Sequence, residues 1–430
     1  MTTGWIEKVE YMEKLQDFVK KYGKVVIEQL QLMPDGLAHF EPWMTGQRES
    51  YASAEAAYIM GYLYRKEHDP IYLENFSGLL KRSISLLKKK NAHMISFAKV
   101  FIFHYSIISL LILPDKERRK YIDFYKNELV AFKDECYAIN TNCAALQYGN
   151  EIFLSCMNPK RKNILYLDRI LNHLEKSQND FGFINDSCME GEQPTDGMPI
   201  AYHMFCCYLL LEVLVVDKAY HILPLEHRKK INKIIISGIK WLSYATYDVG
   251  SVAMAERSRY QVFTMGIQAA LVAVSTPKQV ERVLEQFLDQ YDFNENGSYS
   301  TPNSFSSSIR VGFERYTSTN DYNNLNAIGF ITADLCMDAG ILLFQNENER
   351  KKGLFIDEDS GYAFYRNQHG FMGIALRNHE EGYVVQGNGF HYRLNDCLLP
   401  LADPRDNVAN KVSEAIKVKE KSGGGILVMQ

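Results

Sequence analysis

The hydrophobic pattern of the chain is helical from about residue 5 to about residue 344. Apolar residues recur there at steps of three and four, the spacing that places them on one face of an α-helix. About a dozen segments show this pattern: 6–30, 52–65, 72–87, 98–113, 118–132, 144–157, 166–176, 200–216, 227–247, 259–273, 277–291 and 326–344. No strand-like alternation interrupts them convincingly, so a parallel α/β fold is not expected.

After about residue 346 the pattern becomes that of antiparallel strands. The runs 361–366, 370–377 and 382–386 are short, rich in aromatic and β-branched residues, and bounded by turn residues. The chain therefore divides into a helical domain over residues 1–346, an antiparallel β-region over 347–406, and a Lys-rich tail over 407–430. The tail resembles neither a strand module nor a helix cap, and we predict that it is frayed or cut short.

Sequential helices joined by short loops admit two architectures, an α-solenoid and an (α/α) toroid. No repeat of fixed length with a shared signature is visible, which argues against a regular solenoid. A toroid places its loops around a central cleft, and the polar clusters of this chain fall on such loops. The predicted fold is mainly α: an (α/α) toroid of about a dozen helices followed by a short antiparallel β-region, an incomplete β-sandwich.

Composition excludes several classes of function. The 430 residues carry a net charge of -4, so there is no basic signature for nucleic acid. The longest apolar runs, 107–113 and 209–216, are too short to span a bilayer. The eight Cys match no zinc spacing. Scattered Cys in a chain of this length are typical of small buried hydrophobic residues, which favours a reducing compartment. No signal peptide is evident, so the sequence as written predicts a cytoplasmic location, or a periplasmic or secreted one if a signal was removed.

The densest polar cluster stands before the last predicted helix. Residues 316–326 include two Tyr, four Asn, an Asp and several hydroxyls, and an apolar helical run follows at once. Such neutral hydrogen-bonding groups suit a ligand rich in hydroxyls, and a carbohydrate is the obvious candidate. The alternative is a helix N-cap with a polar turn, because Asn, Asp, Ser and Thr favour such positions.

Similar clusters stand at other predicted helix entrances. Asn140 or Asn142 could point an amide at a ligand carboxylate, although an N-cap explains an Asn there equally well. Tyr202 and His203 begin a long apolar helix. His203 is a candidate general base because the ordinary pKa of His is near 6.5, although His on such a helix is more often an interior group.

Two further clusters offer binding groups. Arg257 and Arg259 could bind a ligand carboxylate or sulfate through bidentate hydrogen bonds. Alternatively, they could form ion pairs with nearby acids such as Glu256. Trp43 offers a platform for stacking before the second helix. No GxSxG, HExxH, P-loop or GxGxxG motif is present. The acids on polar loops leave a hydrolase open, although no pair stands out; these acids are Asp180, Asp186, Asp196 and Asp321.

The order of these clusters resembles that of the (α/α)-toroid polysaccharide lyases, including the heparinase II/III-like proteins and uncharacterised toroid relatives. The resemblance covers roughly residues 40–400 and rests on Asn-Thr-Asn-Cys-Ala-Ala (140–145), Phe-Gly-Phe-Ile-Asn-Asp (181–186), Tyr-His (202–203), Glu-Arg-Ser-Arg-Tyr (256–260) and Asn-Asp-Tyr-Asn-Asn-Leu-Asn (320–326). The strand pattern at 361–377 and the segment 387–396 resemble the entry to the β-sandwich of those proteins, but the β-region is much shorter than a full sandwich. Cys143 and Glu256 stand where an aromatic residue and a Gly are expected.

The resemblance implies β-elimination at a uronic acid, without a metal or a cofactor. Asn142, helped by Arg257 or Arg259, would neutralise the uronate carboxylate. His203 or Tyr202 would remove the C5 proton, and Tyr316 or Tyr322 would protonate the leaving oxygen. The implied partner is an acidic polysaccharide or oligosaccharide, bound by Trp43, Asn140, Asp186, Arg259, Tyr260, Asn320 and Asn323.

Two alternatives to a lyase remain open. One is a toroid glycoside hydrolase that uses paired carboxylates, and the other is a non-catalytic glycan-binding protein. The lyase hypothesis requires Tyr316, Asn320 and Tyr322 to face the same cavity as Asn142, His203 and Arg257.

Overall fold

The computed structural model describes helices over most of the chain and strands near its C-terminal end. The described residues are 3–31, 51–88, 96–131, 140–161, 163–186, 200–248, 251–252, 263–290, 320–345, 352–367, 370–376, 379–381, 384–386, 390–394, 397–400, 417–421 and 425–429. The α-helices among them are α1 (Thr3–Gln31), α2 (Ala52–Glu67), α3 (Pro70–Lys88), α4 (Ser96–Leu111), α5 (Asp115–Ala131), α6 (Thr141–Met157), α7 (Ile164–Lys176), α8 (Ile200–Tyr220), α9 (Leu225–Ala245), α11 (Phe263–Ala273), α12 (Val280–Gln290) and α13 (Asn320–Asp338).

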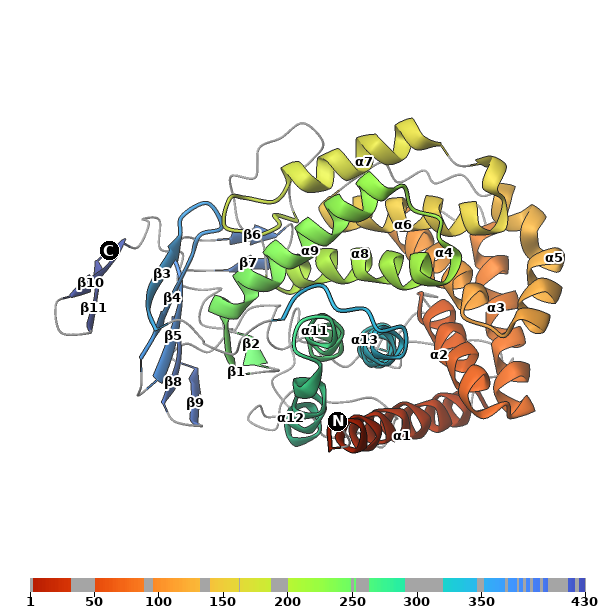
Figure 1. Cartoon of the computed structure of the whole chain (residues 1–430), viewed down its shortest axis with the longest axis horizontal. Helices are drawn as coiled ribbons and strands as arrows, with labels where there is room; N and C mark the ends of the chain where they lie inside the picture. The colour runs from red at the N-terminus through yellow and green to blue at the C-terminus, as the bar shows by residue number, and fades with distance from the viewer. Residues whose placement is uncertain are drawn as a thin grey trace.

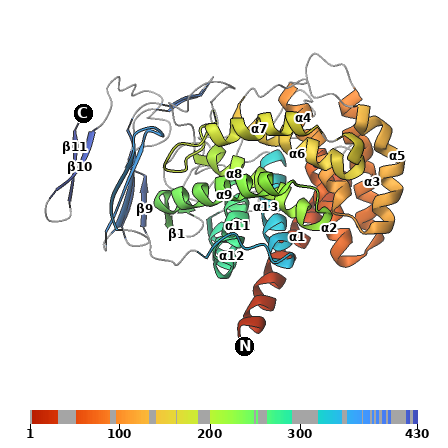
Figure 2. The same cartoon turned by 45° about the horizontal axis from the view of Figure 1, so that its top comes forward.

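These helices alternate between two concentric layers. Contacts run from α2 to α4, α6, α8, α11 and α13, and then from α13 back to α2, so these six helices form a closed inner ring. The helices α1, α3, α5, α7, α9 and α12 each pack against neighbours in that ring from outside (Figures 1 and 2). The predicted (α/α) toroid is therefore confirmed.

The two layers explain the difference in hydrophobic pattern between the helices. An outer helix such as α7 buries one stripe, whereas an inner helix is covered on all sides and is apolar all round. Among the described helices, α8 alone is long and apolar enough to cross a membrane by length and composition. In the toroid, 89% of its apolar stretch is buried, because it is a wall of the inner ring.

Two glycines set the close approach of α11 and α13. A Cβ on Gly266 would lie 2.0 Å from the carbonyl oxygen of Asn326, and one on Gly329 would lie 2.2 Å from the carbonyl carbon of Gly266. The Asn326 side-chain oxygen accepts a hydrogen bond of 2.8 Å from the Gly266 N–H. Neither glycine can be replaced without moving one backbone away from the other.

A buried carboxylate joins the first and last helices where the ring closes. Asp334 of α13 has a fully buried side chain. It accepts hydrogen bonds from the Tyr62 hydroxyl at 2.8 Å and from the Gln16 amide at 3.0 Å, and it pairs with the Lys66 ammonium at 2.7 Å. Burial alone would lower the pKa of Lys66, but Asp334 and Asp338 outweigh it, so this pKa is raised. These bonds tie α1, α2 and α13 together.

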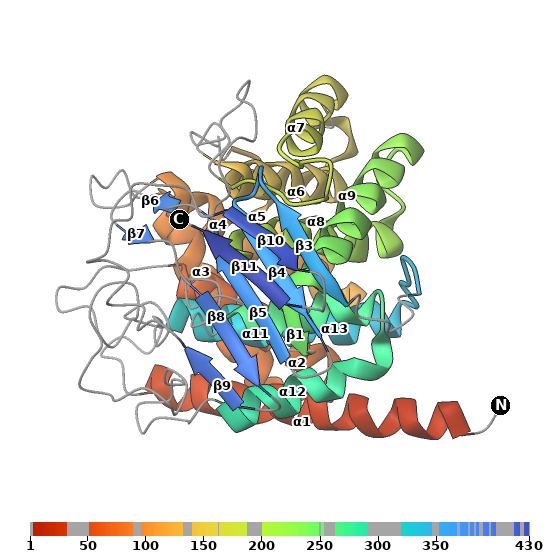
Figure 3. The ribbon, with the colours of Figure 1, turned by 90° about the vertical axis from the view of Figure 1, so that its left-hand side faces the viewer.

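The β-region forms a five-stranded antiparallel sheet with neighbours in the order β3-β4-β5-β8-β9. Its strands are β3 (Gly353–Asp357), β4 (Tyr362–Arg366), β5 (Gly370–Ala375), β8 (Phe390–Leu394) and β9 (Cys397–Pro400), and β6 (His379–Glu381) pairs with β7 (Val384–Gln386). The three predicted strand runs correspond to β4, β5 and β7. Phe355 stacks on Tyr244 of α9 at a centroid distance of 3.8 Å, so the sheet packs against the C-terminal end of that outer helix (Figure 3).

Three expectations differ from the structure. The tail predicted to be frayed contains an antiparallel hairpin, β10 (Lys417–Lys421) and β11 (Gly425–Met429), and β10 contacts β3. Its apolar run 426–429 follows a Ser-Gly-Gly segment, a combination that favours a hairpin. The helix predicted over 227–247 ends earlier, because a second short hairpin, β1 (Thr246–Asp248) with β2 (Ser251–Val252), follows α9. Finally, α13 begins at Asn320 and not at residue 326, so the end of the predicted polar loop is helical.

Candidate functional site

The six inner helices begin at one end of the toroid, which we call the mouth. The early turns of α4, α8 and α11 contact one another through three aromatic rings. Phe205 of α8 packs on Phe101 of α4 at a centroid distance of 5.8 Å and on Phe263 of α11 at 6.1 Å. Tyr62 and Asp334, from the late turns of α2 and α13, meet through a hydrogen bond. Early residues contact early residues and late residues contact late ones, so the inner helices run in the same direction.

The mouth is also the end with long connections. Segments from outer to inner helices are long, as in 32–51, 177–199 and 291–319, whereas those from inner to outer helices are short, as in 68–69 and 221–224. All the polar clusters predicted from the sequence fall on the first type of connection or on the first turns that follow it. Loops at one end of a rigid scaffold are the usual place for binding and catalysis.

Asp186 is a buried carboxylate at the mouth. The loop after α7 brings it to the first turn of α6, where only 3% of the residue is exposed. Its Oδ1 accepts a hydrogen bond of 2.8 Å from the Asn142 backbone N–H, and its Oδ2 accepts one of 2.9 Å from the Asn142 side-chain amide. The Cys206 thiol of α8 points at Oδ1 from 3.8 Å. Anions are favoured at helix N-termini, where backbone N–H groups lack helical partners.

This arrangement gives Asn142 a partner within the protein. Its side-chain amide, which was predicted to meet a ligand carboxylate, donates to Asp186. The N-cap of α6 is Asn140, whose side-chain oxygen accepts from the Cys143 N–H at 3.2 Å and whose amide lies 3.5 Å from Asp186 Oδ2. Both Asn side chains therefore face the helix start and the carboxylate. The sequence showed a polar helix entrance but not the distant acid that occupies it.

His203 does not have the environment of a general base. It is fully buried, its Nδ1 accepts a hydrogen bond of 2.9 Å from the Ile184 backbone N–H, and its Nε2 lies 3.2 Å from the Gly238 carbonyl oxygen. The first contact requires an unprotonated Nδ1 and the second a protonated Nε2, so the ring is neutral. Both nitrogens are engaged in hydrogen bonds. Burial lowers the pKa of His203 to about 3. This His joins the loop before Asp186 to helices α8 and α9.

The buried neutral His203 makes acid stability a test of its role. Below about pH 6.5 the unfolded chain binds a proton at this His, whereas the folded chain does not until the pH nears its folded pKa of about 3. Acidification therefore favours the unfolded state. We expect protonation of His203 in the unfolded chain to lower the free energy of unfolding by about 3 kcal/mol between about pH 7.5 and about pH 4.5.

The measurement compares wild type with His203→Gln, which keeps an acceptor and a donor but does not titrate. Denaturant unfolding across this pH range should show a shallower acid limb for the variant, because all other groups cancel in the difference. His221→Asn, at an exposed His with positive φ, is the matched control and should leave the wild-type slope unchanged. Parallel acid limbs for wild type and His203→Gln would contradict the assignment.

The structure places the remaining predicted residues only in part. Tyr202 is half-buried in the first turn of α8, and Asn323 is buried at 1% exposure on α13. Asn320 and Tyr322 lie in the first turn of α13, and their side chains are outside the described part of the chain. Also outside the described residues are Trp43, Arg257, Arg259, Tyr260 and Tyr316. Whether the predicted groups share one cavity therefore stays a prediction.

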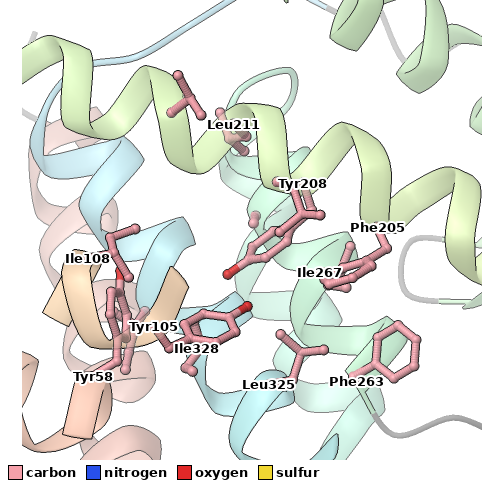
Figure 4. Close-up of a cluster of buried hydrophobic side chains, with 14 of the residues drawn as sticks. Tyr58, Tyr105, Ile108, Phe205, Tyr208, Leu211, Phe263, Ile267, Leu325 and Ile328 are labelled. Carbon is pink, nitrogen blue, oxygen red and sulfur yellow. The ribbon is translucent and has the colours of Figure 1, made fainter. Parts of the chain in front are cut away.

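A polar cluster inside the ring was not predicted. The Tyr208 hydroxyl donates to Glu212 Oε1 at 2.7 Å, and Glu212 Oε2 lies 3.0 Å from Nε2 of the buried His104. Figure 4 shows Tyr58, Tyr105 and Tyr208 entering the ring from α2, α4 and α8 among aliphatic side chains. Burial raises the pKa of Tyr105 and Tyr208 well above the ordinary value, so both remain hydroxyls at neutral pH.

The early turns of the inner helices place a row of aromatic rings near the mouth. Tyr51 stacks on Phe101 at 4.7 Å, and the row continues through Phe205 to Phe263. In sequence these rings look like ordinary core residues, and only ring closure brings them together. Within the described residues, no group of three or more His, Cys, Asp or Glu side chains is arranged to hold a metal ion.

Comparisons with known proteins support the fold. No protein-family model matches the sequence, and no curated protein matches it. Among solved structures, a "possible member of GH105 family" from Salmonella enterica serovar Paratyphi A is similar with a TM-score of 0.51 and 11% identity, over 75% of this chain and 95% of that one. At this identity the match concerns the fold alone, which is that of the (α/α)-toroid class.

Two further solved structures are similar at lower scores. The GH76A alpha-1,6-mannanase from Salegentibacter sp. HEL1_6 has a TM-score of 0.47 and 13% identity, over 72% of this chain and 99% of that one. A polysaccharide lyase has a TM-score of 0.43 and 11% identity, over 75% of this chain and 97% of that one. The first of the three supports the (α/α)-toroid fold, and its description names no heparinase-like family.

Proposed function

We propose that the protein is a carbohydrate-active enzyme that binds a glycan across the mouth and cleaves it with the help of the Asp186 carboxylate. The observation that carries this proposal is a carboxylate fixed by the first turn of α6, at the end of the toroid where the polar helix entrances gather. Proteins described as a possible member of GH105 family, a mannanase and a polysaccharide lyase have similar structures, which agrees with a glycan as substrate.

Among reactions on glycans, hydrolysis is the first candidate. Glycoside hydrolysis needs two carboxyl groups on either side of the scissile bond. Asp186 would be the anionic member, acting as base or nucleophile. Its partner would come from Asp196, on the connection before α8, or from Asp321, in the first turn of α13.

Elimination at a uronic acid is the second candidate. Tyr202 stands in the first turn of α8 at the mouth, where a Tyr could remove a C5 proton. Of the other groups that this mechanism requires, Asn142 and His203 are engaged in hydrogen bonds to Asp186 and to backbone groups. The lyase therefore depends on Tyr202, Arg257, Arg259, Tyr316 and Tyr322.

Product analysis separates the reactions. The purified chain is incubated with neutral and uronate-containing oligosaccharides, and both reducing ends and the ultraviolet absorbance of unsaturated products are followed. Hydrolysis predicts new reducing ends without absorbance. A rise in absorbance on uronate substrates that Tyr202→Phe abolishes would replace hydrolysis with the lyase. Binding by calorimetry without any product would refute an enzyme and leave a glycan-binding protein.

A further inference from the structure

Another buried carboxylate, Asp357 at the end of β3, connects the β-sheet to the toroid. It is fully buried and accepts four hydrogen bonds. The Trp241 indole of α9 donates at 2.8 Å, the Asn179 amide donates to both oxygens at 2.9 Å, and the Ser360 backbone N–H donates at 3.1 Å. All these donors are neutral, and two of the side chains belong to the toroid.

Asn179 bonds both to Asp357 and to the loop that carries Asp186. While its amide nitrogen donates to Asp357, its Oδ1 accepts from the backbone N–H groups of Phe181, Gly182 and Phe183 at 3.1, 3.0 and 2.9 Å. The orientation of the amide is therefore unambiguous: the oxygen faces three donors and the nitrogen faces a carboxylate. One side chain thus bonds to the sheet and to the loop at once.

The rest of the loop is fixed as far as Asp186. Gly182 has a φ of +106°, and a Cβ there would lie 2.3 Å from the Ser237 carbonyl oxygen of α9. Phe183 stacks on His203 at a centroid distance of 4.9 Å and also packs on Trp241. The Ile184 N–H donates to His203 at 2.9 Å.

Two backbone bonds complete the path. The Asn185 N–H donates to the Ser177 carbonyl at 2.9 Å, and the Thr141 N–H of α6 donates to the Asp186 carbonyl at 3.0 Å. Each residue from 181 to 186 is thus tied by a backbone hydrogen bond or a ring contact, without a gap between Asn179 and α6. The sheet is therefore joined to the mouth by a continuous chain of short contacts.

We propose that Asp357 is a positioning residue: the β-sheet acts as a brace that fixes the loop 179–186 and so holds Asp186 against the first turn of α6. In this proposal the sheet holds the loop in position and does not contact the glycan. The effect on catalysis rests on the proposed function. The effect on the position of Asp186 does not, because the Asn142 N–H reports it directly through its bond to that carboxylate.

The test compares Asp357→Asn with wild type by amide hydrogen exchange. The variant retains the size of the side chain but sets an NH₂ group against the Asn179 or Trp241 donor. We expect the amides of residues 181–184 and of Asn142 to exchange about tenfold faster or more, the loss that follows when a hydrogen bond to a charged group is removed. Asp334→Asn, at the other end of the toroid, is the control for general destabilisation.

The outcomes separate the two proposals. The brace is overturned if exchange at Asn142 is unchanged. It is also overturned if exchange increases no more than in Asp334→Asn, compared at the same free energy of unfolding. If glycan cleavage is found, Asp357→Asn should lower kcat about tenfold with KM within a factor of about two, since Asp186 is displaced while binding groups remain. An unchanged kcat overturns the positioning role. Faster exchange at Asn142 in a chain that cleaves no glycan supports the brace and refutes the proposed function.

A milder variant keeps the test valid if Asp357→Asn does not fold. Trp241→Phe removes one donor to Asp357 and retains an aromatic ring against Phe183. We expect a smaller increase in exchange at the same amides, including Asn142. Exchange that stays at the wild-type rate in Trp241→Phe would then count against the brace.

Discussion

Replacement of Asp186 by Asn is expected to lower the rate of glycan cleavage by about 10²- to 10⁴-fold, the range that general acid–base catalysis contributes. The amide is nearly the same size as the carboxylate and can still accept from the Asn142 backbone N–H. It can neither act as a base nor attack a sugar carbon. Initial rates of reducing-end release, measured with circular dichroism as a check of folding, give the result.

Asp180→Asn is the matched control, because this Asp is exposed on the same loop, six positions earlier. Its activity should equal that of wild type. If Asp186→Asn retained more than about a tenth of the wild-type rate, acid–base catalysis by this residue would be excluded. Asp186 would then serve only to anchor the loop to α6.

Replacement of Asp334 by Ala is expected to lower the free energy of unfolding by about 3 kcal/mol, since removal of one partner from a buried ion pair leaves the others unsatisfied. The Tyr62 hydroxyl and the Gln16 amide lose their acceptor at once. Lys66 retains Asp338 at 2.6 Å, which limits the loss. Chemical denaturation followed by tryptophan fluorescence measures the change.

Asp338→Ala provides the comparison. This Asp is 38% exposed and pairs with the same ammonium, so its loss should cost less than about 1 kcal/mol. Equal effects of the two substitutions would contradict the claim that the buried carboxylate, and not the surface charge, joins α13 to α2. The cleavage rate of folded Asp334→Ala should remain unchanged, because this junction lies at the end opposite the mouth.

The helices could be predicted from sequence because their apolar faces are local. Segments such as 52–65 and 200–216 have a three-to-four periodicity that no other structure explains, and both are helices of the inner ring. The start of α13 was predicted late because Asn320–Asn324 read as a turn, whereas helical contacts with α2 and α11 override that preference. Strand β8 lies within the segment 387–396, which resembles the entry to a β-sandwich, whereas β9 was missed because its apolar run is short.

The site could be predicted only as a location. Polar residues at helix entrances indicated which end of the toroid to examine, and the structure brings Asn140, Asn142 and Asp186 together there. The roles could not be predicted, because they depend on partners far away in sequence. Asn142 is engaged by an acid 44 residues later. His203 is engaged by a backbone amide 19 residues earlier and by a carbonyl 35 residues later. No local pattern encodes such partners.

Closure of the inner ring has a consequence for synthesis on the ribosome. The bond between Tyr62 and Asp334 joins residues 272 positions apart, so the inner ring cannot close until α13 has left the exit tunnel. Until then α2, which is buried along most of its length in the finished toroid, has no partner on that side. The growing chain therefore exposes an apolar seam for most of its translation, a state in which binding by chaperones and misassembly with other chains compete with closure.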